Sequence, residues 1–170
     1  QCYAPCGRPA TNKAQMARSA ARGRRARCFD VEAAYLKGEL IAGETVYARP
    51  PPGYRKYDSR GVPIVWRLKV PLYGEADAGF IWNRTLVKQL VGKQGFTQSE
   101  FDPCYFFKLL ADGTRIDIVM YVDDGFVTDD FSGLADKELE IFHAAGFTIE
   151  VKEPRRLLGA NTIFHSASRI

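Results

Sequence analysis

The chain has 170 residues, of which 46% are hydrophobic and 26% are charged, proportions typical of a globular domain with an apolar core. No apolar run approaches the roughly 18 residues that a membrane helix needs, so the composition excludes a membrane-spanning class. Residues 10–27 mix alanine with arginine and lysine where a signal peptide would be apolar, so we expect an intracellular protein with no membrane partner. The first residue is Gln1 rather than Met, which favours a fragment or a processed chain.

The basic residues are concentrated at the N-terminus. The net charge is +4, and residues 1–27 contribute +7 because they hold seven basic residues and no acid, which leaves −3 for the remainder. Such a basic N-terminal segment is compatible with phosphate contacts, and it is equally compatible with a solvated helix face. The four cysteines and two histidines lack the spacing of a zinc site or a disulfide framework, so we expect buried or incidental thiols.

The chain opens with an expected helix and strand. Residues 10–26 have helix-forming composition, with a weak apolar face at Met16 and Ala20. Residues 28–31 predict a short buried strand that contains one acid, Asp30.

A ribbon and a second helix are expected next. Residues 33–36 continue the first strand or form a short helix, and residues 45–48 and 64–68 predict the two strands of a β-ribbon interrupted by a proline-rich loop. The following helix ends near Gly95 and has two apolar rows, namely Phe80, Asn83, Val87, Leu90 and Val91, and Trp82, Leu86 and Leu90.

The second half of the chain predicts a meander of strands. Residues 103–109 and 116–128 are rich in β-branched and aromatic residues, with turns at Ala111-Asp112-Gly113 and Asp123-Asp124-Gly125. The Asp-Asp-Gly turn presents two adjacent carboxylates, and taken alone it is more often a solvated hairpin than a site.

A helix and two strands close the expected fold. Ser132 is a fair N-cap for a helix that ends near Gly146, and residues 147–151 and 161–164 are expected strands. The order β-α-β-β-α-β, with the ribbon inserted after the first strand, predicts an α+β fold with a split βαβ, ferredoxin-like antiparallel sheet.

This topology predicts a cluster of acids. The first and third strands of a split βαβ sheet lie side by side, which would bring Asp30 beside the hairpin that carries Asp123 and Asp124. Three carboxylates at one sheet edge repel one another unless they hold cations. Two Mg²⁺ ions sharing the cluster could activate a hydroxyl and stabilise a leaving phosphate oxygen.

The motifs resemble those of Ty1/copia-type retrotransposon polymerases. Tyr121-Val122-Asp123-Asp124 is similar to the catalytic box of reverse transcriptases, and residues 29–40 are similar to the segment with the family's first acidic motif. Further motifs fall in the family's order: Tyr3-Ala4-Pro5, Pro51-Pro52-Gly53-Tyr54, Trp66-Arg67-Leu68-Lys69, Leu72-Tyr73-Gly74, Gly95-Phe96-Thr97 and Asp102-Pro103-Cys104. The four-residue box is weak alone, whereas the ordered series spans nearly the whole chain.

The resemblance implies a metal site and a catalytic basic residue nearby. It assigns Asp30, Asp123, Asp124 and Val31 to the metal site. Of the three catalytic aspartates, Asp30 and Asp123 would be the main ligands and Asp124 more peripheral, with Mg²⁺ or Mn²⁺ as cofactor. It assigns Lys152 as a basic residue that assists phosphoryl transfer, although an exposed strand lysine is the alternative.

The resemblance also implies substrate contacts. Tyr35 would screen the sugar 2′-position and favour deoxynucleotides, with an ordinary half-buried aromatic as the alternative. The other implied substrate contacts are Ala33, Ala34, Asp77, Tyr121 and Val122. Leu157-Leu158-Gly159 resembles the hairpin that grips the primer end, and a plain turn is equally compatible.

The chain departs from the family pattern in places. The family's Gln-Ala-Pro-Arg-x-Trp run is here Asp77-Ala78-Gly79-Phe80-Ile81-Trp82, which puts a negative charge near phosphates and replaces the arginine. The helix before Asp30 is depleted of leucine and isoleucine, and upstream finger strands and a thumb are not evident. We therefore expect this piece alone to hold primer and template poorly and to be inactive.

The resemblance predicts one reverse-transcriptase domain fragment, residues 1–170, with residues 1–40 and 78–170 as palm and residues 41–77 as a fingers-type insertion. The expected function is RNA-directed DNA synthesis in a cytoplasmic particle or the nucleus. The implied partners are an RNA template, a DNA or tRNA primer, dNTPs, and integrase and RNase H segments of the polyprotein. One alternative is a non-catalytic palm remnant that only binds nucleic acid, and a weaker one is an RNA-binding module that stacks bases on strand aromatics.

Overall fold

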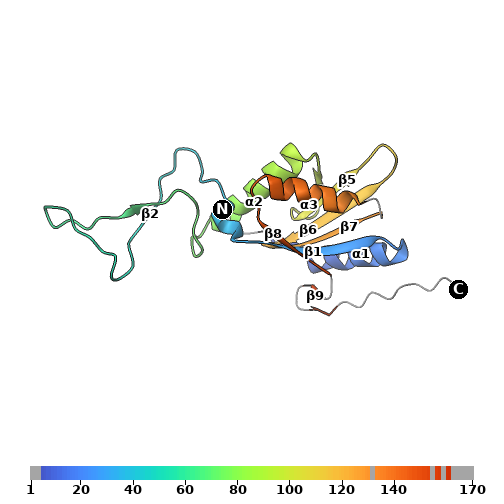
Figure 1. Cartoon of the computed structure of the whole chain (residues 1–170), viewed down its shortest axis with the longest axis horizontal. Helices are drawn as coiled ribbons and strands as arrows, with labels where there is room; N and C mark the ends of the chain where they lie inside the picture. The colour runs from blue at the N-terminus through green and yellow to red at the C-terminus, as the bar shows by residue number, and fades with distance from the viewer. Residues whose placement is uncertain (1–4, 131–132, 154–155, 158–159, 162–170) are drawn as a thin grey trace.

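The computed structural model describes residues 5–130, 133–153, 156–157 and 160–161. Its elements follow in chain order (Figure 1): α1 Pro9–Ala21, β1 Arg25–Val31, the 3₁₀-helix η1 Ala34–Lys37, β2 Tyr47–Ala48, β3 Trp66–Arg67, α2 Ala78–Val87, the π-helix η2 Lys88–Lys93, β4 Thr97–Gln98, β5 Tyr105–Leu109, β6 Arg115–Tyr121, β7 Asp124–Asp129, α3 Leu134–Ala144, β8 Ile149–Lys152, β9 Arg156–Leu157 and β10 Ala160–Asn161.

A six-stranded sheet with the order β4-β5-β6-β7-β1-β8 is the centre of the fold. Each pair of neighbours in it is antiparallel. The run β8-β1-β7-β6 has the strand order expected of a split βαβ sheet, with β1 beside β7. The prediction of an α+β fold with an antiparallel sheet is therefore confirmed.

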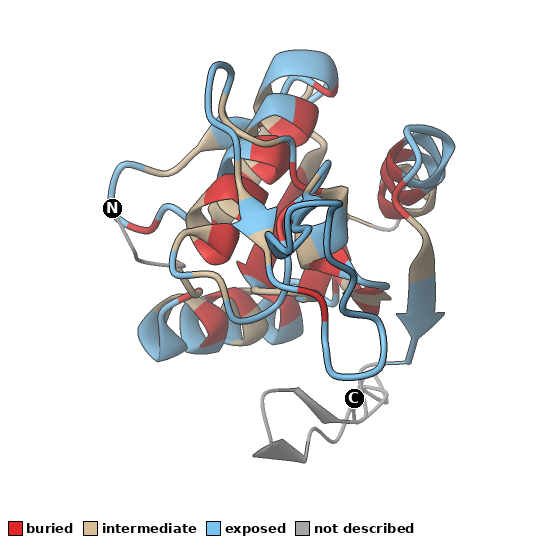
Figure 2. Cartoon of the chain, turned by 90° about the vertical axis from the view of Figure 1, so that its left-hand side faces the viewer, coloured by how far each residue is buried: buried red, intermediate tan, exposed pale blue. Residues whose placement is uncertain are grey.

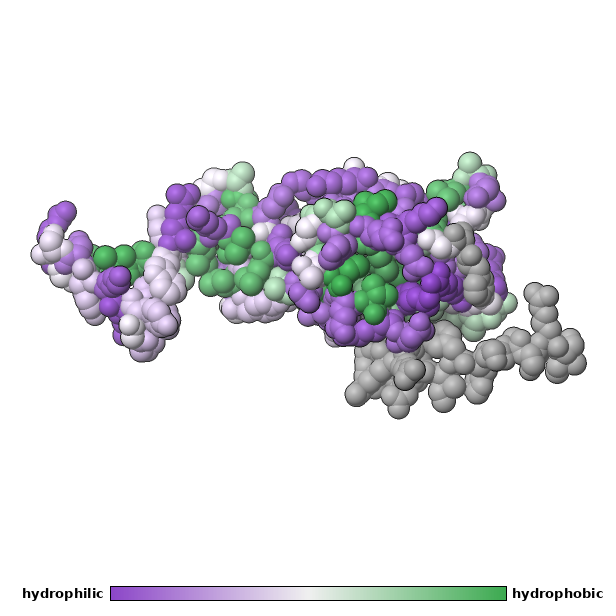
Figure 3. Space-filling view, viewed as in Figure 1, coloured by the Kyte–Doolittle hydropathy of each residue, from purple (hydrophilic) through white to green (hydrophobic). Residues whose placement is uncertain are grey.

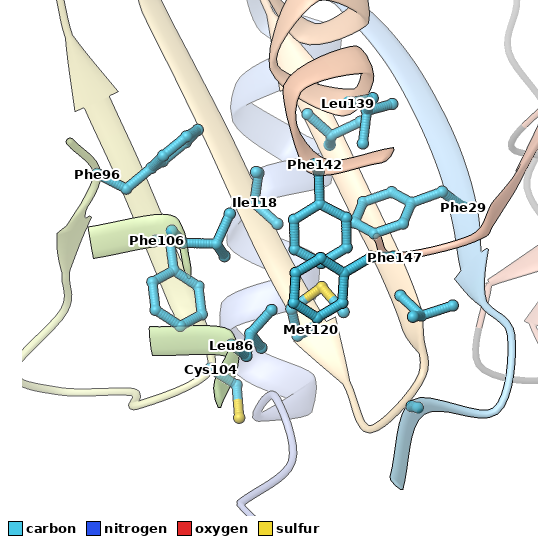
Figure 4. Close-up of a cluster of buried hydrophobic side chains, with 14 of the residues drawn as sticks. Phe29, Leu86, Phe96, Cys104, Phe106, Ile118, Met120, Leu139, Phe142 and Phe147 are labelled. Atoms are coloured by element: carbon cyan, nitrogen blue, oxygen red, sulfur yellow. The ribbon is translucent and has the colours of Figure 1, made fainter. Parts of the chain in front are cut away.

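Helices cover both faces of this sheet (Figure 1). Helices α2 and α3 lie on one face, where a large apolar core includes Phe29, Phe106, Ile118 and Phe142 (Figure 4). Helix α1 lies on the other face. Successive strand residues point to opposite faces, so both faces of the central strands can be buried.

The smaller core under α1 consists of Ala26, Cys28 and Phe126, with Met16 packed against it. Cys28 in this core is buried, and so is Cys104, which directly precedes β5. The expectation of buried thiols is confirmed for these two residues.

Helix α1 packs on the sheet mainly through polar side chains, and of its predicted apolar face only Met16 contributes. Its buried residues are Asn12, Gln15 and Ser19, while Ala20 is exposed. Gln15 Nε2 donates to the carbonyl oxygen of Asp117 at 3.0 Å and to Thr128 Oγ1 at 3.1 Å. The helix therefore needs no leucine or isoleucine, because buried hydrogen bonds attach it to the sheet.

Other helix predictions are confirmed in part. The row of Trp82, Leu86 and Leu90 is buried as expected, whereas the members of the other predicted row, apart from the shared Leu90, are only half-buried. Residue Gly133, with φ of 69°, precedes α3, and the N-cap predicted at Ser132 lies outside the described residues. The closing strand predicted at 161–164 lies outside them from residue 162 onward.

The ribbon between η1 and α2 extends away from the sheet (Figure 1), and Figure 2, which looks along it, shows it mostly as exposed. We call residues 46–69 the arm. Its strands β2 and β3 have 2 residues each, shorter than predicted, and the ladder continues through Leu68 N–H to Val46 O and Ile64 N–H to Lys56 O, each 2.9 Å. Every residue from 51 to 67 is exposed, so little apolar burial stabilises longer strands.

Among the described residues, no helix has the length and apolar character that crossing a bilayer requires.

Candidate active site

The hairpin between β6 and β7 differs from the predicted turn. Tyr121 pairs with Asp124, so the turn consists of Val122 and Asp123, and Asp124 and Gly125 belong to β7. The prediction that Asp123-Asp124-Gly125 forms the turn is therefore wrong for its last two residues. Gly125 is required by packing instead, since a Cβ there would lie 2.1 Å from Cζ of Phe29.

The turn itself is backbone-strained and held from two sides. Val122 has φ of 60°, a left-handed conformation that is an outlier for a β-branched residue. Trp82 Nε1 donates to the carbonyl oxygen of Val122 at 2.7 Å, and the Val31 N–H donates to the carbonyl oxygen of Asp123 at 2.9 Å. Strain of this kind is concentrated at functional sites.

The acids of β1 and β7 are brought together as the topology predicted. Asp30 is paired directly with Asp124, and Asp123 precedes Asp124 in the turn. Glu150 of β8 is paired with Asp30 on the other side. Paired residues on neighbouring strands share a face, so Asp124, Asp30 and Glu150 form a row across three strands.

Glu150 was not singled out in the sequence. The residue lies in the predicted closing strand, and only the register of β8 against β1 places it opposite Asp30. Such a register cannot be assigned before the strand order is known.

The row is electrostatically strained. Partial burial raises the pKa of Asp124, and the negative charges of Asp123 and Asp30 raise it further, while Lys152 opposes the shift. Lys152 Nζ lies 2.8 Å from Glu150 Oε2, and both side chains are largely exposed. That hydrogen bond raises the pKa of Lys152, with smaller contributions from Asp30 and Asp124.

The donor set fits a divalent cation held partly by substrate. Among the residues that the structure describes, no three His, Cys, Asp or Glu side chains form a ready-made metal cluster. Mg²⁺ is commonly bound by one or two carboxylates together with substrate phosphates rather than by a complete protein cage. Carboxylates that repel one another, as Asp124 and its neighbours do, are relieved by such a cation.

The ring of Tyr35 is packed against another tyrosine. It is half-buried and lies 4.7 Å from the ring of Tyr73, centroid to centroid. Burial raises the pKa of Tyr35, and the negative charge of Asp123 adds to the shift. Ala33, with φ of 52°, and the buried Ala34 lead from the end of β1 to Tyr35.

The remaining predicted contacts are spread more widely. Tyr121 ends β6 and is 41% exposed, adjoining the turn. Asp77 precedes α2 at its N-terminus, where a negative charge is favoured by the helix dipole. Leu157 pairs with Ala160 in a small antiparallel ladder, and Leu158 and Gly159 lie outside the described residues.

The N-terminal basic residues form ion pairs within the domain. Arg18 and Arg24 contact the fully buried Asp117, at 3.0 Å for Arg18 Nη2. Arg25 lies 2.7 Å from Asp136 and Arg27 lies 3.5 Å from Glu153. The sequence left open phosphate contacts or a solvated helix face. The ion pairs contradict a merely solvated face for these four arginines, and the phosphate contacts stay a prediction.

Asp117 is a structural residue that sequence reasoning missed. Arg115 Nε also donates to it at 2.9 Å, and the Tyr105 hydroxyl donates to the same oxygen. Burial raises the pKa of Asp117, but hydrogen bonds from Tyr105, Arg24 and Arg115 outweigh this effect and lower it. The signal in the sequence that could have indicated its role is the position of this acid within the β-branched run of β6.

Another acid attaches the chain's start to the sheet. Asp102 Oδ2 accepts the Arg8 N–H at 2.9 Å and the Thr11 hydroxyl, and its Oδ1 accepts the Cys104 N–H at 3.0 Å. Asp102 therefore caps the N-terminus of α1 from a distant segment.

An α+β domain with carboxylates on two adjacent central strands offers oxygen ligands of the kind that divalent cations prefer. The family model described as reverse transcriptase (RNA-dependent DNA polymerase) matches residues 1–161. The chain therefore belongs to the reverse transcriptase family, and its relatives identify it as part of a Ty1/copia-type retrotransposon reverse transcriptase.

Two relatives illustrate this relationship. A Saccharomyces cerevisiae protein named after transposon Ty5-1 is 33% identical over 96 residues, which are 56% of this chain and 29% of the relative. A retrovirus-related Pol polyprotein from transposon TNT 1-94 of Nicotiana tabacum is 28% identical over 109 residues, which are 64% of this chain and 8% of the polyprotein. The matched region thus spans less than a third of either relative.

Proposed function

We propose that this domain carries the catalytic palm of an RNA-directed DNA polymerase, with residues 1–40 and 78–170 as palm and residues 41–77 as a fingers-type insertion. The reaction is in-line attack of a primer 3′-hydroxyl on the α-phosphate of a dNTP, with release of pyrophosphate. The observation that supports it best is the pairing of Asp30 with Asp124 next to Asp123 in the strained turn.

The residues of the proposed metal site have distinct roles. Asp30 and Asp123 hold the cations, Val31 adjoins them, and Asp124 has a more peripheral role. Bound Mg²⁺, or Mn²⁺, supplies activation of the attacking hydroxyl and neutralises charge on the phosphates. Because no covalent intermediate is needed, catalysis rests on positioning and electrostatics.

Neighbouring residues select the nucleotide and assist the leaving phosphate. Tyr35 occupies the space that a ribose 2′-hydroxyl would need, which favours deoxynucleotides. Ala33 and Ala34 bring backbone close to the incoming triphosphate, and Tyr121 and Val122 border it. Lys152 assists the leaving phosphate. Its hydrogen bond with Glu150, and further the charges of Asp30 and Asp124, raise its pKa and so favour its protonated form.

The partners follow from the reaction. They are an RNA template, a DNA or tRNA primer held in part by Leu157-Leu158-Gly159, and dNTPs. The tobacco relative is a polyprotein, so we infer further segments such as integrase and RNase H, acting in a cytoplasmic particle or the nucleus.

A second candidate is a palm that binds nucleic acid without catalysis. It is favoured by the lack of a ready-made three-residue metal cluster among the described residues and by Asp77 in place of the family's glutamine. Metal-dependent dNTP incorporation separates the two.

The test is primer extension on an RNA template by the full-length polymerase that contains this domain. Asp123→Asn should lower dNTP incorporation on the order of a thousandfold, because a metal ligand contributes several kcal/mol to the transition state. Glu140→Gln is the matched control, since Glu140 is an exposed acid on α3, and it should leave the rate unchanged. Equal rates for both variants would overturn the assignment, and a wild-type polymerase that binds primer and template without extending them would support the second candidate.

A further inference from the structure

The arm exposes aromatic side chains that the proposed active site does not use. Tyr47, Tyr54 and Tyr57 are 61%, 68% and 61% exposed, and Trp66 is 47% exposed. Several large rings gathered on one solvent-exposed ribbon are uncommon in a domain surface and indicate a binding surface. In Figure 3 the arm carries both hydrophobic and hydrophilic patches on one side of the molecule.

The arm is also strongly basic. Residues 46–69 contain one acid, Asp58, and six basic residues, which are Arg49, Arg55, Lys56, Arg60, Arg67 and Lys69. All of them lie in the described part of the chain, where none of the six takes part in a salt bridge. Asp58 accepts the N–H groups of Arg60 and Val62 at 2.8 Å, within its own turn. The arm therefore presents six cations that pair with no carboxylate among the described residues, unlike the arginines around Asp117, although Arg55 Nε donates to the carbonyl oxygen of Pro50 at 3.4 Å.

A cavity of about 250 Å³ lies between the aromatic residues of the arm. Its lining includes Tyr54, Trp66 and Lys56, together with Pro50 and Ile64. The rings of Tyr54 and Trp66 meet edge to face, 6.4 Å between centroids and 65° between planes. Both rings keep a large exposed surface, so a flat third ring can stack there with a cation at its edge.

We propose that the arm binds a single-stranded segment of nucleic acid, with an unpaired base stacked in the cavity of Tyr54 and Trp66 and phosphates on the basic residues. Stacking on aromatic side chains requires unpaired bases, whereas a duplex offers only its backbone and groove edges. An apolar protein partner would leave the six cations without a role, so charge complementarity selects a polyanion.

The location connects this surface to the proposed reaction. The chain leaves the arm through Tyr73, whose ring packs on Tyr35 of the proposed active site. A strand held by the arm would therefore lie on an approach to the active site. The inference rests on the proposed function for its biological meaning, but the binding surface can be tested apart from catalysis.

The two tryptophans allow a direct test with the 170-residue chain. Trp66 is exposed while Trp82 is 2% exposed, so quenching of tryptophan fluorescence by a short unstructured oligonucleotide reports on Trp66. We expect single-stranded RNA or DNA to quench and a blunt duplex to quench much less. The Trp66 variants lack this probe, so their affinity is read from the fluorescence anisotropy of a dye-labelled oligonucleotide. Trp66→Phe should keep the affinity, and Trp66→Ala should weaken it about tenfold, the typical effect of losing one stacking partner.

The basic residues are tested through salt dependence. The double variant Arg55→Gln, Lys56→Gln should lower the slope of log affinity against log salt by about 1.4, since each phosphate contact on a single strand contributes about 0.7. Lys13→Gln with Lys137→Gln is the matched control, because both lysines are exposed, lie outside the arm and change the net charge equally. Emission from the buried Trp82 verifies that each variant is folded.

Each possible result of these binding experiments either supports the proposed single-strand surface or overturns it. Quenching by RNA alone, by DNA alone or by both supports a single-strand surface and identifies the strand it prefers. Equal binding of the duplex, or unchanged affinity in both Trp66→Ala and the double arm variant, would overturn the proposal. Asp123→Asn should bind the oligonucleotide normally, so a failure of the catalytic assignment would not be mistaken for a failure of this one.

Discussion

The indole Nε1 of Trp82 donates a 2.7 Å hydrogen bond to the carbonyl oxygen of Val122. Trp82 belongs to α2, and Val122 sits in the hairpin turn with φ of 60°. The contact therefore couples the helix that follows the arm to the turn that carries Asp123. A strained turn persists only when its surroundings determine it, and this bond is one of those determinants.

Trp82→Phe in the full-length polymerase should lower dNTP incorporation about tenfold while binding of oligonucleotide to the arm stays unchanged. A hydrogen bond of this kind contributes about 1 kcal/mol, and a tenfold rate change corresponds to about 1.4 kcal/mol. Phe147→Leu is the control, because it alters the ring packed 5.9 Å from Trp82 without removing the bond. If both variants incorporate dNTPs equally well, the bond does not position the turn.

Gly125→Ala should destabilise the domain by about 1–3 kcal/mol, the usual effect of overpacking, because the new methyl group would meet the ring of Phe29. Urea denaturation measures the change. Adding Phe29→Leu should recover part of the loss, since the two residues are in contact and their effects are not additive. Strict additivity of the two substitutions would show that the close approach is unimportant.

Asp117→Asn should lower the free energy of unfolding by about 3 kcal/mol at pH 7, because it removes the charge that Arg24 and Arg115 face in a buried site. The folded pKa of Asp117 is lowered, so its contribution is present above the unfolded value of about 3.9 and is lost as pH falls through the folded pKa. Denaturation of wild type and variant should therefore converge only when the pH has fallen below the lowered folded pKa of Asp117. The exposed Asp112→Asn provides the control, and a difference that persists at acid pH would contradict the ion-pair account.

Cys28 and Cys104 should resist alkylation in the folded chain. Burial, with a contribution from Asp124, raises the pKa of Cys28 to about 11, and burial, with contributions from Asp102 and Cys6, raises that of Cys104 to about 12. The thiolate is the reactive form, so iodoacetamide at pH 8 should label both residues only after unfolding in urea. Peptide mass mapping reads the result. Rapid labelling of either thiol in the native chain would show that the core opens.

The sequence was sufficient for the order of the split βαβ elements and for the meeting of Asp30 with the β6–β7 hairpin, but not for strand β4 or the π-helix η2. Both follow from alternation in the strands and from the strand order of a split βαβ sheet, which places the first strand beside the third. The position of the turn could not be predicted so well. Gly125 suggested a turn residue, whereas its lack of a side chain makes room for Phe29 from a strand 96 residues earlier.

Long-range polar contacts were also beyond sequence reasoning. Arg24 and Asp117 lie 93 residues apart in the chain, and no local pattern pairs them. Polar residues such as Gln15 suggested a weakly packed helix, yet they form the hydrogen bonds that fix α1 to the sheet. Glu150 became part of the acidic row only through the register of β8.

The claim that Asp123 binds the catalytic cation is tested most directly by exchanging its ligand atom. Asp123→Cys in the full-length polymerase replaces a hard oxygen ligand with a softer thiolate, which binds Mg²⁺ poorly and Mn²⁺ or Cd²⁺ better. Primer extension by this variant should be lost in Mg²⁺ and partly restored by the thiophilic ion. The Glu140→Gln control should extend the primer in Mg²⁺ as the wild type does and should gain nothing more than the wild type from the thiophilic ion. Full Mg²⁺-supported extension by Asp123→Cys would contradict the assignment of this carboxylate as a metal ligand.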